Sequence, residues 1–165
     1  MEDNKVLKLV YTFFLGLLLA IFVGVGINTF YPGPKAPEYP TTSFSYEKEP
    51  SEEEKQKQKE FDQKQAEYFE KEKPYSRNVS IAALVAGVVL LAISLVYERR
   101  IKIIADGVLL GGLFTLLYSI GRGFASEDTK YNFVVVTIGL LIALYLGYHR
   151  FVRPENKKAP KAKSP

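Results

Sequence analysis

The sequence predicts an all-α integral membrane protein, a compact four-helix transmembrane bundle with one polar helix outside the membrane in its first loop. Apolar residues gather into four blocks, and charged residues gather between them. Each block approaches the roughly 20 residues that a helix needs to cross the hydrocarbon. One such block could equally be a buried soluble helix. Four of them in 165 residues, with little polar chain to cover them, favour the membrane.

The blocks divide the chain into segments. The predicted segments are an N-terminal region with the first transmembrane helix (1–30), an outer loop (31–78), three further transmembrane helices (79–97, 103–120 and 133–148) and a basic tail (149–165). The first apolar run follows Lys5 and Lys8 and so resembles a signal peptide. It is long, however, and lacks a small-residue cleavage site, which favours an uncleaved helix.

The outer loop divides into two parts. Residues 31–50 are rich in proline, which fixes φ and disfavours helix, so we expect an extended spacer there. The alternative is a docking segment for a partner. Residues 51–73 are highly charged and open with a Ser-x-x-Glu capping box at Ser51, which predicts a helix. Pro74 is expected to end that helix.

The orientation follows from Lys and Arg near the helix ends. With four spans, both termini lie on one side, together with the basic turn 99–102 and the basic tail. The positive-inside rule then places both termini in the cytoplasm and the loop 31–78 outside, and we expect a plasma membrane location.

Small residues at four-residue spacing predict how the helices pack. Lipid supplies no hydrophobic drive for helix association, so close backbone approach becomes important. Such stripes occur in each apolar block. The residues predicted to lie at helix contacts include Gly16, Ala20, Gly24, Gly107, Gly111, Gly139, Ala143 and Gly147.

Asp106 is the clear ionisable residue inside an apolar block, and such residues are candidates for function. Lys102 lies one turn earlier, and the end of the fourth block brings His149 and Arg150 to a similar depth. We expect an ion pair that joins the third helix to the fourth. The alternative is a proton or cation site, although a relay would need deeper titratable groups.

Two further polar residues lie near the expected outer surface. Arg122 is expected to anchor the chain at the interface or contact a lipid phosphate, and Asn28 to bond a neighbouring helix.

The residue types that are missing narrow the chemistry. The chain has no cysteine and one histidine, which excludes thiol chemistry, disulfide exchange and bis-histidine haem ligation. The metal clusters of intramembrane proteases and lipid-headgroup transferases have no candidate residues either. We therefore expect no enzymatic activity, catalytic residue, metal or cofactor.

The function expected from these exclusions is that of a non-catalytic structural, scaffold or accessory subunit, acting through its outer loop and helix packing. The alternative is a small oligomeric channel or transporter subunit. Expected partners are the bilayer, anionic lipid headgroups at the basic tail, and a second copy or another membrane protein. Nucleic acid is not expected, because the tail is short.

Overall fold

The computed structural model describes residues 3–38, 51–98 and 100–152, and these ranges contain four α-helices and no strand. The elements are α1 (Asp3–Phe30), α2 (Glu52–Tyr97), α3 (Lys102–Phe124), α4 (Thr129–Gly147) and the π-helical turn η1 (Tyr148–Val152). All four α-helices are long and apolar enough to cross a membrane. The predicted all-helical class is therefore confirmed. Residues 39–50 of the expected spacer and 153–165 of the expected tail lie outside the described ranges.

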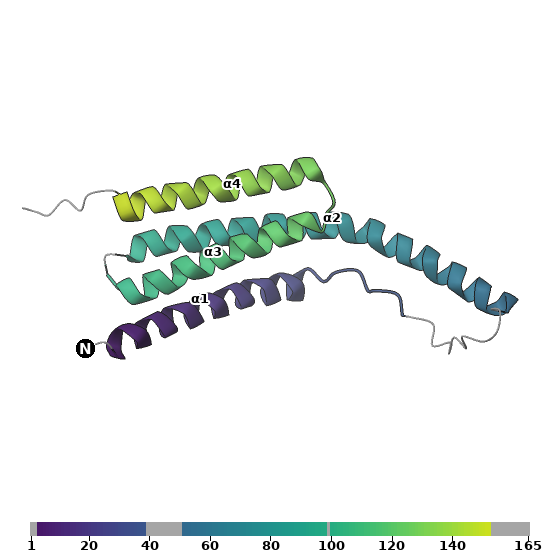
Figure 1. Ribbon diagram of the computed structural model, residues 1–165, viewed down its shortest axis with the longest axis horizontal. Helices are drawn as coiled ribbons and strands as arrows, with labels where there is room; N and C mark the ends of the chain where they lie inside the picture. The colour runs from purple at the N-terminus through teal and green to yellow at the C-terminus, as the bar shows by residue number, and fades with distance from the viewer. Residues whose placement is uncertain (1–2, 39–50, 99, 153–165) are drawn as a thin grey trace, which may run out of the picture.

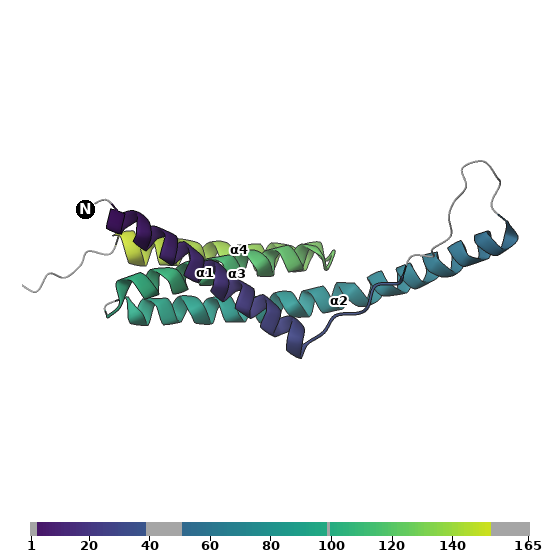
Figure 2. The ribbon, with the colours of Figure 1, turned by 90° about the horizontal axis from the view of Figure 1, so that it is seen from below.

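Helix α3 lies at the centre of the fold, with α1, α2 and α4 packed around it. Figure 2 shows α1 crossing α3 diagonally, whereas α2 and α4 run more nearly along it. The start of α1, the turn between α2 and α3, and the end of α4 lie together, and we call this the terminal end (Figure 1). At the opposite end α2 continues far beyond the other helices. Its projecting part, residues 52–73, is called the arm.

The expected break at Pro74 is wrong, because Pro74 lies inside α2. Helix α2 has 46 residues, which at 1.5 Å per residue makes it about 69 Å long. A proline removes one intrahelical hydrogen bond and its ring crowds the preceding turn, so it can kink a helix without ending it. Figures 1 and 2 show α2 bending where it leaves the bundle. The contacts described below hold the turns on both sides of the bend.

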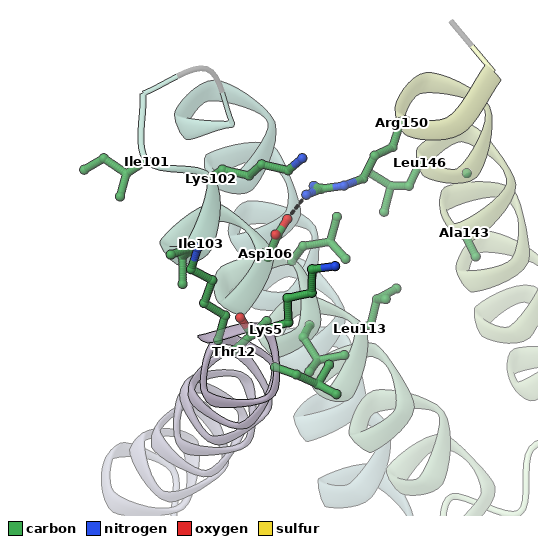
Figure 3. A pocket seen from close by; sticks show the side chains of 15 residues that line it. Lys5, Thr12, Ile101, Lys102, Ile103, Asp106, Leu113, Ala143, Leu146 and Arg150 are labelled. Atoms are coloured by element: carbon green, nitrogen blue, oxygen red, sulfur yellow. Dashed lines mark hydrogen bonds and ion pairs between the residues drawn. The ribbon is translucent and has the colours of Figure 1, made fainter. Parts of the chain in front are cut away.

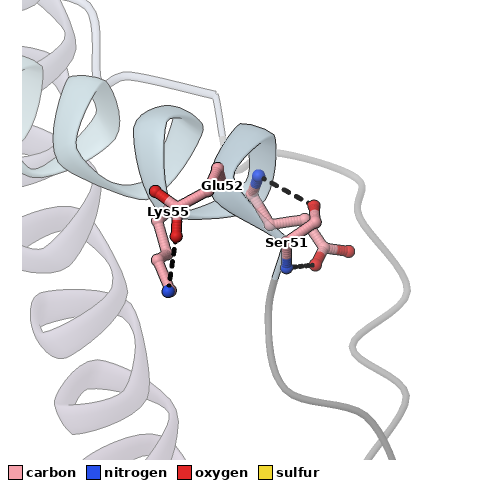
Figure 4. Close-up of polar contacts among 4 residues, drawn as sticks. Ser51, Glu52 and Lys55 are labelled. Atoms are coloured by element: carbon pink, nitrogen blue, oxygen red, sulfur yellow. Dashed lines mark hydrogen bonds and ion pairs between the residues drawn. The ribbon is translucent and has the colours of Figure 1, made fainter.

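The predicted capping box at the start of α2 is confirmed (Figure 4). The backbone N–H of Ser51 donates to Glu54 Oε2 at 2.7 Å, and the N–H of Glu54 donates to Ser51 Oγ at 3.3 Å. Lys55 forms an ion pair with Glu52 at 2.8 Å in the same turn. These contacts satisfy N–H groups that the first turn of a helix leaves without partners, so they fix where the arm begins.

Glycines bring α3 close to α1. A Cβ added to Gly111 would lie 2.9 Å from Leu19 Cβ and 3.2 Å from the carbonyl oxygen of Gly16. A Cβ added to Gly16 would meet Leu110 at 2.8 Å, and one added to Gly107 would meet Leu15 at 2.5 Å. These three positions of the predicted stripes therefore lie at a helix contact.

The next residue, Gly112, faces α2 instead. A Cβ there would lie 2.6 Å from Leu91 Cδ2 and 3.2 Å from the carbonyl oxygen of Gly87. Adjacent residues on a helix point in directions about 100° apart, as follows from 3.6 residues per turn. The pair Gly111-Gly112 therefore lets two helices approach α3 from two sides.

Buried serines tie α2 to α3. Ser80 Oγ donates to the carbonyl oxygen of Ser119 at 2.7 Å, and Ser119 Oγ donates to that of Ser80 at 2.8 Å. Near the terminal end, Ser94 Oγ donates to the carbonyl oxygen of Ala105 at 2.7 Å. All three serines are fully buried. The two helices are therefore joined by hydrogen bonds at both ends of their contact.

The small residues predicted to form a packing stripe on α4 do not make close helix contacts in the structure. A Cβ added to Gly147 would have nothing within 4 Å, and Ala143 is exposed. Gly139 is buried, but the nearest atom to an added Cβ is Ile120 Cδ1 at 3.4 Å, an ordinary contact. Leu146 does join a small core with Leu91 and Leu116. Helix α4 thus packs on α3 more loosely than α1 and α2 do.

Two further predicted packing positions on α1 lie in looser surroundings. A Cβ added to Gly24 would reach only Tyr118 Cζ, at 3.9 Å, and Ala20 is half-buried. The diagonal crossing of α1 over α3 accounts for this, because two crossing helices are close only around the point where they meet.

Candidate functional site

Asp106 lies in the second turn of α3 and forms an ion pair with Arg150, which lies in η1 (Figure 3). Arg150 Nη2 donates to Asp106 Oδ1. The side chain of Arg150 is 12% exposed and that of Asp106 is 33% exposed, so the charges are partly withdrawn from solvent. The geometry places the expected bridge between the third and fourth helices on Arg150.

A second carboxylate approaches the same guanidinium. Glu98, at the C-cap of α2, has Oε1 4.0 Å from Arg150 Nε. Nη1 of Arg150 is buried and has no hydrogen-bond partner within the described ranges. Arg150 therefore connects α4 to α2 as well as to α3, and its charge is balanced mainly by Asp106.

The other two members of the predicted cluster are not part of this ion pair. Lys102 is exposed and forms no ion pair within the described part of the chain. The His149 ring lies 6.1 Å from the ring of Tyr145 in a tilted arrangement. In the described ranges, no three His, Asp or Glu side chains lie together as a group that could hold a metal ion.

A groove of about 930 Å³ opens beside the ion pair at the terminal end. Its walls come from α1, α3 and α4, and Figure 3 shows Lys5, Lys102 and Arg150 arranged around it from these three sides. The deeper walls are apolar. They include Leu109, Leu110, Leu113, Ala143 and Leu146. The groove therefore combines cationic side chains at one end with an apolar interior.

The base of the arm carries a second polar cluster. The rings of Tyr31 and Tyr75 stack with centroids 5.2 Å apart, and Arg122 Cζ lies 5.1 Å from the centroid of the Tyr75 ring. Asn78 Nδ2 donates to Tyr31 Oη at 3.1 Å. Arg122 is thus held against an aromatic face from its own fold. Asn28 is exposed and makes no hydrogen bond within the described ranges.

An ion pair fixes the arm to the turn between α3 and α4. Lys73 Nζ lies 2.7 Å from Glu127 Oε2. The hydrogen bond to Glu127, and then the negative charge of the Glu127 carboxylate, raise the pKa of Lys73 above the ordinary 10.5. Glu127 has φ 56°, a left-handed conformation that few non-glycine residues adopt. Tyr131 Oη also donates to the carbonyl oxygen of Arg77 at 3.3 Å. These contacts brace α2 just before and after its bend.

The start of the proline-rich segment lies against α2. A Cβ added to Gly33 would meet the Tyr75 ring at 2.9 Å, and Tyr75 Oη donates to the carbonyl oxygen of Tyr31 at 3.2 Å. Pro34 and Pro37 line a hollow of about 400 Å³ with arm residues that include Tyr68. Partial desolvation and then the nearby Glu72 carboxylate raise the pKa of Tyr68. The described part of this segment, residues 31–38, therefore contacts the chain's own arm.

Sequence reasoning missed three features of these sites. The contact of Glu98 with Arg150 was missed, because a glutamate at the end of an apolar block is typical of an ordinary charged residue at the membrane interface. Two of the buried serines, Ser80 and Ser94, could have been found, because they recur with Ala83 and Gly87 at helical spacing. The groove could not, because it depends on the distance between α1 and α4.

Comparison of the chain with protein-family models, with curated proteins and with solved structures finds no match.

Proposed function

We propose that the chain is an integral membrane protein whose four α-helices all cross the bilayer, with both termini in the cytoplasm and the arm outside. The length and apolar composition of the four helices support membrane insertion. The orientation is supported by charge, because Lys5, Lys8, Arg100, Lys102 and Arg150 all lie near the terminal end.

Within that membrane frame, we propose a non-catalytic scaffold or accessory subunit that holds its arm outside the membrane for a partner. The observation that carries this proposal is the continuity of α2 from the bundle into the arm. A helix of 22 residues, the length of the arm, reaches about 33 Å. The braces at Lys73, Tyr75 and Arg77 fix its direction relative to the bundle. A rigid projection of this kind suits the presentation of a binding surface at a set height above the membrane.

The alternative, a small oligomeric channel, receives less support from the geometry. A pore needs polar side chains free to face water. Ser80 and Ser119 instead bond each other's backbone, and Thr115 Oγ1 donates to the carbonyl oxygen of Gly111 in its own helix. These groups contribute to helix packing.

The orientation is tested with cysteines placed in a chain that has none. In intact cells, an impermeant maleimide is expected to label Lys59→Cys and to leave Lys5→Cys unlabelled until the membrane is permeabilised. Labelling of position 5 but not position 59 would invert the proposed orientation.

The role of the arm is tested by photo-cross-linking. Phe69 is 49% exposed on the arm. A photoactivatable residue there is expected to give a discrete cross-linked protein product in the native membrane. The same residue at Gln63, exposed on another face of the arm, is the matched control. The scaffold proposal would be rejected in favour of the channel if Phe69 gave no cross-linked product and liposomes that hold the purified protein showed ion flux.

A further inference from the structure

The groove at the terminal end has an uneven distribution of charge. Four cationic side chains and one carboxylate line it. The carboxylate, Asp106, is already paired with Arg150. Lys5, Lys8 and Lys102 are exposed and make no ion pair within the described ranges. The mouth of the groove therefore carries three available ammonium groups, with no unpaired carboxylate among its lining residues.

The three lysines come from two helices that are far apart in sequence. Lys5 and Lys8 lie one turn apart near the start of α1, whereas Lys102 opens α3. Figure 3 shows the side chain of Lys5 reaching from α1 into the groove, beneath the Asp106–Arg150 pair. A compact anion at the mouth could therefore contact both helices.

The groove reaches about halfway along the bundle. On α3 its lining residues run from Ile101 to Leu113, which is about 18 Å at 1.5 Å per residue. The hydrocarbon core is about 30 Å thick, so this depth matches one leaflet. A helix from a second copy that ran parallel to the bundle would extend well beyond a groove of this depth. An acyl chain that descends from a headgroup needs only the one leaflet.

The size and wall chemistry fit the same occupant. A volume of about 930 Å³ lies within the roughly 300–1,000 Å³ typical of small-molecule sites. The interior, from Leu109 down to Leu113 on α3 and at Ala143 on α4, is apolar. A long apolar molecule with one anionic end would match both parts of the groove.

We propose that this groove binds one phospholipid with an anionic headgroup. The phosphate lies among Lys5, Lys8 and Lys102, and an acyl chain follows the apolar wall of α3 between α1 and α4. Arg150 holds the Asp106 carboxylate, which keeps that charge from repelling the phosphate. The proposal rests on the proposed membrane insertion and is independent of the role of the arm. It assigns a defined site to a lipid, in contrast to diffuse attraction at a basic surface.

The test uses the full chain purified in detergent, with lipid binding followed by native mass spectrometry. Phosphatidylglycerol is the anionic probe, phosphatidylcholine the zwitterionic one, and inorganic phosphate tests whether the headgroup charge alone suffices. We expect one phosphatidylglycerol to remain bound per chain, at least tenfold tighter than phosphatidylcholine, and no retention of inorganic phosphate.

Two variants address the two ends of the site. Replacing Lys5, Lys8 and Lys102 together by glutamine should weaken phosphatidylglycerol binding by about fivefold for each lysine. Ala143→Trp fills the apolar part and should weaken both lipids. Lys130→Gln, at the opposite end of α4, and Ala92→Trp, exposed on α2, are the matched controls and should leave lipid binding unchanged.

Thermal unfolding in detergent checks that each variant is folded, and a variant that unfolds is replaced by the single substitution Lys102→Gln. Equal binding of the two lipids, or full binding by a folded triple variant, would overturn the proposal. If Ala143→Trp converted an oligomer into a monomer and left lipid binding unchanged, the groove would be a contact surface for a second copy of the chain, and the lipid proposal would be overturned. Failure of membrane insertion would appear separately, because neither position 5 nor position 59 would then be labelled by the impermeant maleimide in intact cells.

Discussion

Helix α3 meets its neighbours in two different ways. Toward α1 and α2 it presents glycines and serines, so backbones come close and hydroxyl groups bond to carbonyl oxygens. Toward α4 it presents an ordinary apolar contact around Leu146 and one ion pair, Asp106 with Arg150. The same small residues that predict close packing on α3 occur on α4, yet an added Cβ would make only an ordinary contact at Gly139 and would meet nothing within 4 Å at Gly147.

The difference shows that a small residue allows a close contact but does not create one. In lipid, helix association depends on packing and on interhelical hydrogen bonds. Gly111 and Gly112 are opposed by Gly16 and Gly87 on partner helices, which lets both backbones approach. Gly147 has no such partner. One side of α3 is therefore a fixed core, whereas the other side leaves room for the groove.

The largest effect is expected from Gly111→Leu. An added Cβ is already 2.9 Å from Leu19 Cβ, an atom fixed to the backbone, so the larger side chain must separate α1 from α3. We expect a loss of about 3 kcal/mol, the upper end for overpacking. The measurement is thermal unfolding in detergent. Gly147→Leu is the control and should be nearly neutral, so an equal loss in both variants would contradict the comparison.

A smaller effect is expected from Asp106→Asn, which keeps the shape but removes the charge that balances Arg150. We expect a loss of about 1–2 kcal/mol, between the values for exposed and for fully buried pairs. Adding Arg150→Gln should recover part of it. Thermal unfolding of both single variants and the double variant gives the coupling energy. A coupling near zero would mean that the bridge from α3 to α4 contributes nothing to stability.

The serine pair is expected to contribute less. Ser80→Ala and Ser119→Ala should each cost about 0.6 kcal/mol, the average for interhelical hydrogen bonds in membrane helices. Their losses should not add, because the two hydroxyl groups also contact each other, with Ser80 Oγ 3.3 Å from Ser119 Oγ. Thr137→Ala is the control, since Thr137 Oγ1 donates only to Phe133 within α4. Additive losses would show that the two bonds act independently.

The smallest effect is expected at the base of the arm. The pKa of Lys73 is raised by Glu127, so the stabilisation from this pair is complete below the unfolded pKa of lysine. It is lost as the pH rises through the folded pKa, above 10.5. The difference in unfolding temperature between the wild type and Lys73→Gln should therefore be constant near neutral pH and shrink above that value. Lys71→Gln, which removes a lysine outside this pair, should show no such pH dependence.

The sequence by itself determined the four apolar helices, the capping box at Ser51 and the small residues that α3 uses against α1. These depend on composition and on contacts within a few residues, so a linear pattern reveals them. The sequence also predicted that Asp106 and Arg150 lie at a similar level along the bundle, because the lengths of the third and fourth apolar blocks determine where each residue falls.

The tertiary structure decided the rest. Pro74 could end α2 or bend it, and contacts from Tyr31, Glu127 and Tyr131 hold the turns around the bend. The sequence predicts Lys102, His149 and Arg150 all near Asp106, and the structure pairs Asp106 with Arg150, which lies in the turn η1. The groove lies between α1, which crosses α3 diagonally (Figure 2), and α4, which packs on α3 through looser contacts. The angle and distance between helices arise from all their contacts together, and no single segment of sequence specifies them.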